Sequence, residues 1–140
     1  MAQNKTVIYQ MLNSLVTALK PIGAKTYLLN RPRKVDEKMD KFIVVDMPTQ
    51  LRRTAKGYDK YRYETTGVIY AFVRAQTDGS PNIDRQTQFI SDIKELFPIT
   101  DDIIECVNPN ELMRGLDETN FQVTTITFAL RTKVNAFRTE

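Results

Sequence analysis

Two amphipathic helical segments, one at the front of the chain and one in its second half, constrain the fold most. Apolar residues recur at helical spacing from Val7 to Leu19 and again from Ile83 to Phe97. Runs typical of β-strands lie around them, at residues 25–29, 41–47, 50–55, 60–75, 103–107 and about 121–134. Runs of strands with short connections favour an antiparallel, in part mixed, β-sheet with the two amphipathic helices packed on one face. The predicted fold class is therefore α+β.

The flanks of these segments carry residues that begin helices. Asn4 or Thr6 can cap the first helix, which is expected over about residues 5–19. Ser80 and Pro81 predict the start of the second helix. The chain has 140 residues without a shift in composition or an internal repeat. We therefore expect a single domain over residues 1–140.

Some strands are more apolar than expected for a sheet that has one face exposed to solvent. Residues 42–45 and 68–73 are apolar on both faces, where strict alternation is expected. Two interpretations remain: a loop or the hairpin of the same chain covers the second face, or another subunit does. The last strand also changes phase, since Phe121 and Val123 are odd-numbered whereas Ile126 and Phe128 are even-numbered. A β-bulge would produce such a change.

Charge is distributed unevenly along the chain. The net charge is only +3, but residues 31–62 carry ten basic and five acidic groups, and residues 78–120 carry three basic and ten acidic groups. Charge blocks often serve only as solvated faces. The alternative is a head-to-tail assembly in which the basic region of one subunit meets the acidic region of the next.

The composition disfavours an enzyme. The chain contains no His, which excludes Ser-His-Asp and Cys-His machinery, and its one Cys cannot form an intramolecular disulfide. Cys106 lies in an apolar strand and is expected to be a buried, inert thiol. No glycine-rich phosphate-binding motif is present. We expect no catalytic residues, no metal and no cofactor.

The basic hairpin formed by residues 50–55 and 60–75, with its tip near residues 56–59, is the main candidate surface. Basic groups and Tyr residues interleave there, which suits phosphate contact and base stacking. The alternative is a polar hairpin whose Tyr residues make cross-strand pairs. We predict that the following residues form an assembly or DNA-facing surface: Arg52, Arg53, Lys56, Tyr58 and Lys60.

Two further charged groups complete the candidate surfaces. A basic loop holds Arg31, Arg33 and Lys34. Two carboxylate pairs, Asp101 with Asp102 and Asp117 with Glu118, are interpreted as solvated turn residues that form an acidic partner surface. A catalytic carboxylate pair would need a desolvated partner, and nothing near these pairs is apolar enough to indicate one.

The order of elements resembles the tail-terminator (tail-completion) proteins of long-tailed bacteriophages and their neck-ring relatives. The resemblance covers nearly the whole chain. It is carried by the opening helix 6–19, the strand 42–47 ending in Pro48, the long strand 64–74, the helix 83–97, and the strands 103–107 and 121–133 with a turn-rich spacer between them. It is a pattern of elements without a signature motif.

The resemblance implies a non-enzymatic virion protein that forms a ring at the head–tail junction. Such a subunit caps the tail tube, joins it to the connector and contacts both neighbouring proteins. Six subunits are expected, with twelve as the alternative. The sequence leaves open whether the lumen contacts packaged DNA non-specifically. Assembly in the host cytoplasm is expected, because the sequence has neither a run of about 18 apolar residues nor a secretory signal. The alternatives are a small nucleic-acid-binding module that uses residues 51–63 and, third, a metal-dependent enzyme that uses the acidic turns.

Overall fold

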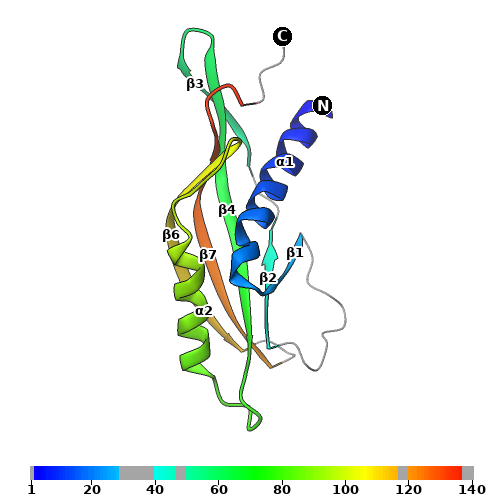
Figure 1. The fold of residues 1–140 in the computed structure, drawn as a ribbon, viewed down its shortest axis with the longest axis vertical. Coiled ribbons are helices and arrows are strands. Elements are labelled where there is room, and N and C mark those ends of the chain that lie inside the picture. The colour runs from blue at the N-terminus through cyan, green and yellow to red at the C-terminus, as the bar shows by residue number, and fades with distance from the viewer. Residues whose placement is uncertain (1, 29–39, 47–49, 117–119, 137–140) are drawn as a thin grey trace.

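The computed structural model describes residues 2–28, 40–46, 50–116 and 120–136, with the side chains of residues 2–6 left out. Its elements are shown in Figure 1. In chain order they are α1 (Ala2–Leu19), the 3₁₀ turn η1 (Lys20–Ile22), β1 (Lys25–Leu28), β2 (Lys41–Val45), β3 (Arg52–Gly57), β4 (Lys60–Arg74), α2 (Ile83–Glu95), β5 (Ile99–Thr100), β6 (Ile104–Leu116) and β7 (Phe121–Thr132).

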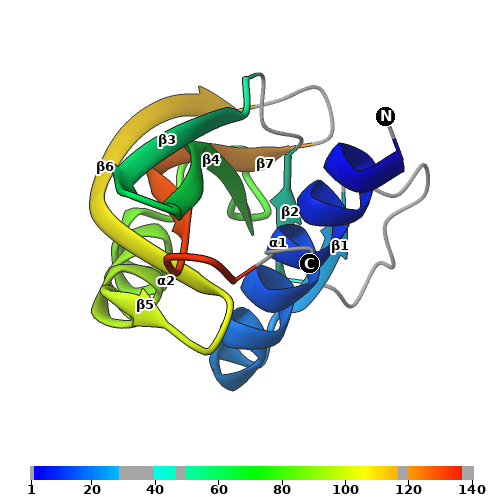
Figure 2. The ribbon, with the colours of Figure 1, turned by 90° about the horizontal axis from the view of Figure 1, so that it is seen from above.

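The strands of the described residues form one mixed sheet. The order is β1-β2-β4-β7-β6-β5, and β3 pairs with β4. β1 and β2 run parallel, whereas the other pairs are antiparallel. Seen from above, the sheet curls into a half-barrel (Figure 2). The predicted α+β class with a mixed sheet is therefore confirmed.

One face of the sheet, called here the core face, carries the main hydrophobic cluster. Buried residues of both helices belong to this cluster together with residues of β2, β4, β6 and β7. Helical spacing explains the contribution of each helix, because residues three and four apart share a side. The helical members are Val7, Met11, Leu12, Leu15 and Leu19 of α1 and Phe89 and Ile93 of α2. Ile90 of α2 is also buried, at 3% exposure.

The opposite face carries a smaller aromatic cluster. Phe42 stacks on Phe72 with 4.4 Å between ring centroids, and Phe121 meets Phe42 edge-on at 5.1 Å. Phe42 and Phe121 are 0% and 1% exposed in the single chain. This cluster accounts for the strands that are apolar on both sides. Another subunit is not needed to bury these aromatic rings.

The same cluster explains the change of phase in β7. The register between β4 and β7 runs unbroken from Glu64 opposite Arg131 to Arg74 opposite Phe121. The predicted bulge is therefore wrong for this pair of strands. Even-numbered residues such as Phe128 face the main cluster, and odd-numbered Phe121 faces the aromatic cluster. The hydrophobic side changes because two different cores lie along one regular strand.

The turn expected after Val107 is a second correction. β6 continues from Ile104 to Leu116 and pairs with β7 along its length, with shifts of register between Val107 and Asn110 and between Met113 and Gly115. Asn108 and Gly115 have φ of 59° and 87°. Asn and Gly tolerate this left-handed backbone, so the extra residues form bulges and the strand does not end.

The start of α2 also differs from expectation. Asn82, rather than Ser80, caps the helix: its side-chain oxygen accepts a hydrogen bond from the Arg85 backbone N–H at 3.2 Å. A buried network then ties this end of α2 to β7. Gln122 Nε2 donates to Gln86 Oε1 at 2.6 Å, and Gln86 Nε2 donates to Thr124 Oγ1 at 2.9 Å. Buried amides need such partners, so this network sets how α2 docks on the sheet. α1 begins at Ala2, earlier than the predicted start near residue 5.

Candidate assembly surface on the hairpin and the α2–β6 groove

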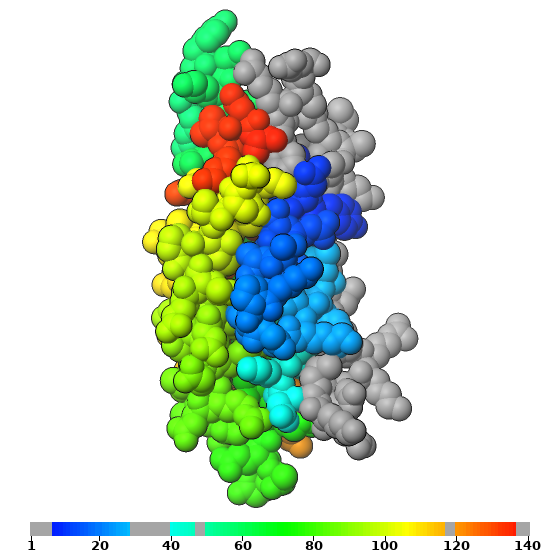
Figure 3. Space-filling model, viewed as in Figure 1, coloured from blue at the N-terminus to red at the C-terminus, as the bar shows by residue number. Residues whose placement is uncertain are grey.

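The hairpin of β3 and β4 projects at one end of the molecule (Figures 1 and 3). Gly57 pairs with Lys60, so only Tyr58 and Asp59 form the turn. Asp59 has φ of 62° and Gly57 has φ of 133°, conformations that suit a tight turn. Tyr58 at the tip is 98% exposed. An aromatic side chain without packing in its own subunit is unusual, because aromatic rings contribute most when they are buried.

The five residues predicted for this surface are all exposed, but they do not form one patch. The β3–β4 register places Arg53 opposite Tyr63 on the core face and Arg52 opposite Glu64 on the other face. The Arg53 guanidinium lies over the Tyr61 ring, 4.0 Å from its centroid. Lys56 Nζ lies 3.7 Å from Glu64 Oε2. Arg53 and Lys56 thus make contacts within the subunit, while Tyr58 and Lys60 lie at the tip.

The other Tyr residues of the hairpin belong to packing. Tyr61 and Tyr63 meet edge-on with 6.0 Å between centroids, and Tyr63 is only 8% exposed. They also meet β3 across the hairpin, since Arg53 pairs with Tyr63 and stacks on Tyr61, as expected of Tyr residues that make cross-strand pairs. Of the three Tyr residues in the predicted surface region, Tyr58 is the one left for contact with another molecule.

Asn135, which the sequence analysis did not single out, fastens the hairpin to the end of β7. Its Oδ1 accepts a hydrogen bond from the Tyr61 backbone N–H at 3.0 Å, and its own N–H donates to the Tyr61 carbonyl at 2.7 Å. Its Nδ2 donates to the Asp59 carbonyl at 3.3 Å. Asn135 lies 74 residues after Tyr61 and 76 residues after Asp59 in the chain. These bonds hold the arm in place while its tip stays exposed.

A charged network covers the base of the hairpin on the face opposite the core. Glu105 of β6 lies 3.6 Å from Arg62 Nη1, 3.3 Å from Arg131 Nε and 3.9 Å from Lys133 Nζ. Arg62 also contacts Glu64 at 2.9 Å. The network joins three strands, which no local sequence pattern could reveal. Three basic groups meet two carboxylates in this network, so much of the charge at the base of the hairpin is paired within the subunit.

The other predicted charged surfaces are described only in part. Arg31, Arg33 and Lys34, and likewise Asp117 and Glu118, lie outside the described residues. Asp101 and Asp102 are exposed. Asp101 Oδ1 accepts hydrogen bonds from the backbone N–H groups of Ile103 and Ile104, both at 2.7 Å. Asp101 therefore closes the turn before β6, as its interpretation as a turn residue requires.

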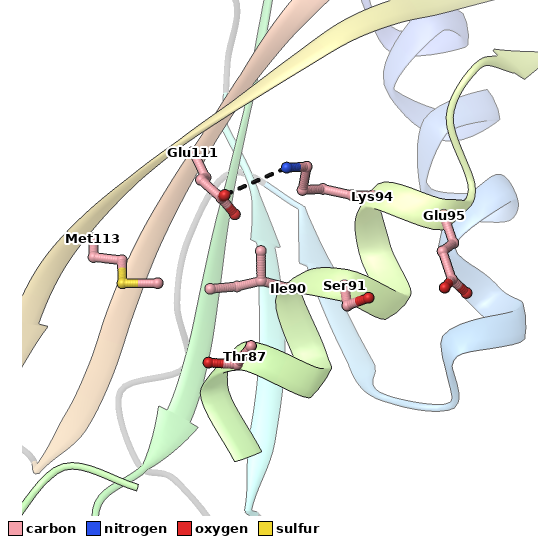
Figure 4. Close-up of a pocket in the computed structure, with 7 residues that line it drawn as sticks. All are labelled: Thr87, Ile90, Ser91, Lys94, Glu95, Glu111 and Met113. Carbon is pink, nitrogen blue, oxygen red and sulfur yellow. Dashed lines mark hydrogen bonds and ion pairs between the residues drawn. The ribbon is translucent and has the colours of Figure 1, made fainter. Parts of the chain in front are cut away.

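A groove between α2 and the bulged half of β6 is the second candidate surface (Figure 4). It encloses about 320 Å³. Buried Ile90 forms its apolar floor, and Met113, 55% exposed, forms the wall on β6. Lys94 Nζ and Glu111 Oε1 close one end with an ion pair of 3.3 Å. The remaining lining residues are Thr87, Ser91 and Glu95 of α2.

The groove exists because β6 has an exposed edge beside α2. β5 pairs only with residues 105 and 106 of β6. Beyond them, Leu112, Met113 and Leu116 are 58%, 55% and 43% exposed. Exposed apolar side chains on an edge strand are typical of a contact surface, because natural edge strands are usually protected by charge or cover.

Comparison with protein-family models and with curated proteins gives no match for this chain. Its function must therefore be argued from the arrangement of its own residues.

The chemistry of the remaining candidate groups is limited. Burial raises the pKa of the Cys106 thiol to about 12, with a smaller contribution from the nearby Asp101 charge. A thiol is reactive as its thiolate, so Cys106 is inert near neutral pH. The described part of the chain holds no group of three or more Cys, Asp or Glu side chains placed to share a metal ion. Within that part, too, no helix has the length and apolar character needed to cross a membrane.

Proposed function

We propose that this chain is a non-enzymatic structural subunit of a ring at the head–tail junction of a long-tailed bacteriophage. In this role it caps the tail tube and joins it to the connector. The observation that carries the proposal is the projecting hairpin, which ends in a Tyr that is 98% exposed and is fastened by Asn135 next to its turn. A stiff arm with an exposed aromatic tip suits docking to a neighbouring protein, since buried aromatic anchors dominate the energy of protein interfaces.

The element order supports the same proposal. The tail-terminator proteins that the chain resembles combine an opening helix, a sheet with a long strand, a second helix and a closing pair of strands. Here β4 is that long strand and also one arm of the hairpin. In the assembled ring, Arg52, Lys56 and Lys60 would face an acidic surface of a neighbour. Such complementary charge sets orientation and speeds association more than it adds affinity.

A tube-capping assay tests this proposal. Purified chain is added to the tail-tube protein of the same phage while the tube polymerises, and tube lengths and ends are measured by electron microscopy. We expect shorter tubes that carry a ring at one end, and native mass spectrometry should give a closed oligomer, six subunits being expected. Tubes of unchanged length without end rings would contradict the proposal.

Matched charge variants test the role of the hairpin. Arg52→Ser with Lys60→Ser removes two exposed charges from the arm, whereas Lys20→Ser with Lys25→Ser removes two exposed charges elsewhere. Each exposed site should change stability by less than about 0.5 kcal/mol. Capping of the tail tube should decrease only in the Arg52→Ser/Lys60→Ser double variant. Equal capping by both pairs would remove the hairpin from the assembly surface.

A nucleic-acid-binding module is the second candidate function. It is favoured by the position of Tyr58 between Lys56 and Lys60, because basic groups and an exposed ring suit backbone contact and base stacking. The same variants decide between the candidates in a duplex-binding titration over a series of salt concentrations. Binding by the wild-type chain with a steep salt slope, lost in the hairpin pair alone, would favour this second function.

A further inference from the structure

The exposed tip of the hairpin and the open groove between α2 and β6 have complementary chemistry. The tip offers a fully exposed Tyr ring beside Lys56 and Lys60. The groove offers an apolar floor, Ile90, and a thioether wall, Met113. Aromatic rings pack favourably against methionine sulfur. A volume of about 320 Å³ lies at the lower end of the range typical of ligand pockets, which suits one aromatic side chain.

The charges at the two surfaces are also complementary. Residues 52–62 of the hairpin carry five basic groups and one acidic group. The charged residues that line the groove are two carboxylates, Glu95 and Glu111, and one basic group, Lys94. Glu111 is part of the groove, and its ion pair with Lys94 is partly exposed, with side-chain exposures of 36% and 39%. Opposite fields of this kind orient two proteins before they touch.

A single molecule cannot join the two surfaces. The hairpin tip lies at one end of the half-barrel, and α2 lies toward the other end (Figure 1). The groove is lined by α2 and β6, so it is far from the tip. The hairpin is part of the continuous strand β4 and is held by Asn135, so it does not fold back on the groove. A contact between them must therefore use two copies of the chain. Such a contact joins different surfaces, so it repeats head to tail and closes into a ring if the rotation allows.

We infer that Tyr58 of one copy inserts into the α2–β6 groove of the next copy, against Ile90 and Met113, with Lys60 beside Glu111. This inference rests on the proposed ring and names the two surfaces that form its subunit contact. It explains why an aromatic ring is exposed at the tip of a fastened arm, and why Met113 is exposed beside α2. It also gives the uneven charge of the chain a structural role.

A complementation experiment tests the inference. Tyr58→Ala removes the inserted ring but leaves the groove intact. Met113→Lys adds a charge that repels the hairpin lysines but leaves the hairpin intact. Both positions are highly exposed, so folding should be unchanged, which circular dichroism melts would verify. In sedimentation velocity, each variant alone should lose at least about tenfold in self-association.

The equal mixture of the two variants gives the sharper result. The Met113→Lys copy supplies a normal hairpin and the Tyr58→Ala copy supplies a normal groove. One good contact can form between them, but no further copy can be added. We therefore expect a 1:1 dimer and no larger species. A mixture that stays monomeric, or that forms the same large assemblies as wild type, would overturn the inference.

Two matched controls exclude general effects of the substitutions. Tyr9→Ala removes another exposed Tyr, 44% exposed on α1, and Leu112→Lys adds a charge to the neighbouring residue on the opposite face of β6. Both should associate like wild type. Loss of association in Leu112→Lys equal to that in Met113→Lys would refute the groove as the contact.

Disulfide trapping offers an independent measurement. A Tyr58→Cys copy and a Met113→Cys copy should cross-link on mild oxidation, whereas a Leu112→Cys copy should not. Native Cys106 does not compete, because it is buried and the pKa of its thiol is raised to about 12. A ring that forms normally from Tyr58→Ala and Met113→Lys chains would refute this contact while leaving the proposed ring intact. Loss of duplex binding in Tyr58→Ala, with unchanged association, would assign the tip to nucleic acid instead.

Discussion

Gly67 gives the sharpest test of how the sheet packs. It lies in the middle of β4, directly opposite Phe128 of β7. A Cβ atom at position 67 would lie 2.3 Å from Cε2 and 2.5 Å from Cζ of Phe128. Carbon atoms in contact normally lie about 3.5–4.0 Å apart, so the ring would have to move by about 1 Å. Phe128 is 2% exposed and its ring meets Phe97 at 5.1 Å, which leaves little space for that movement.

The expected cost of Gly67→Ala follows from two opposing effects. Forcing an extra carbon into a packed core costs about 1–3 kcal/mol. Replacing Gly by Ala recovers about 0.5–1 kcal/mol of backbone entropy. Because the overlap with Phe128 is severe, the packing cost should lie in the upper half of its range, about 2–3 kcal/mol. The net free energy of unfolding should therefore fall by about 1–2.5 kcal/mol. For a chain of 140 residues this corresponds to a fall of about 3–9 °C in melting temperature.

A double-mutant cycle with Phe128→Leu identifies the cause. Phe128→Leu alone should destabilise the protein, because it leaves a gap beside Phe97. In that background the added methyl group at position 67 has room, so Gly67→Ala should cost less than it does in the wild type. Urea unfolding of the four proteins measures the difference. A neutral Gly67→Ala, or an equal cost in both backgrounds, would refute the packing argument.

Two other predictions test the core. Leu15→Ala should lower the free energy of unfolding by about 2–5 kcal/mol, because the Leu15 side chain is 0% exposed between α1 and the sheet. As a control, Tyr9→Ala on the exposed side of α1 should change the free energy of unfolding by less than about 0.5 kcal/mol. Thermal melts measure both. Burial raises the pKa of Cys106 from 9.0 to about 12, so stability should be complete below pH 9 and should fall, by about 4 kcal/mol in all, as the pH rises from 9 to 12. Urea unfolding of wild type and Cys106→Ala across this range measures the effect, and equal alkaline losses in both would exclude the thiol as its source.

The elements that depend on local periodicity could be predicted from the sequence. The predicted apolar side of α2 is buried as expected at Phe89, Ile90 and Ile93, but Ile83 at its first turn is 65% exposed, contrary to the pattern. The strand-like runs at 41–47 and 60–75 appear as β2 and β4. Periods of 3.6 and 2 residues survive in the sequence because each element buries one side against the same core.

The bulged half of β6 could not be predicted in the same way. Asn108, Pro109 and Gly115 are typical of turns, and the local pattern indicated a break. β6 nevertheless follows β7 because the pairing beyond Val107 is set by β7, which is regular along its whole pairing with β4. Pairing with β7 therefore outweighed the local preference of these residues for a turn, and they form β-bulges within the strand. The groove beside α2 was missed for the same reason.

The hairpin shows where sequence reasoning about a site stops. Its basic and aromatic residues were identified from their spacing. Which of them pack within the subunit and which stay exposed at the tip depends on the register between β3 and β4. Arg53 stacks on Tyr61, and Lys56 bonds to Glu64, because β3 pairs with β4 in one particular alignment. The Asn135 bonds depend on the chain returning to the hairpin after β7.

These contacts have a consequence for binding. A flexible arm would lose conformational entropy on docking, and that loss would weaken the contact. Here most of that entropy is already lost during folding, because Asn135 orders the arm next to its turn and the Glu105 network orders its base. What remains to be ordered on docking is little more than the side chains at the tip, Tyr58 and Lys60. A substitution that loosens the arm but leaves the side chains of the tip unchanged should therefore weaken association, because docking would then cost more conformational entropy. The rigidity of the arm thus contributes to assembly together with the chemistry of its tip.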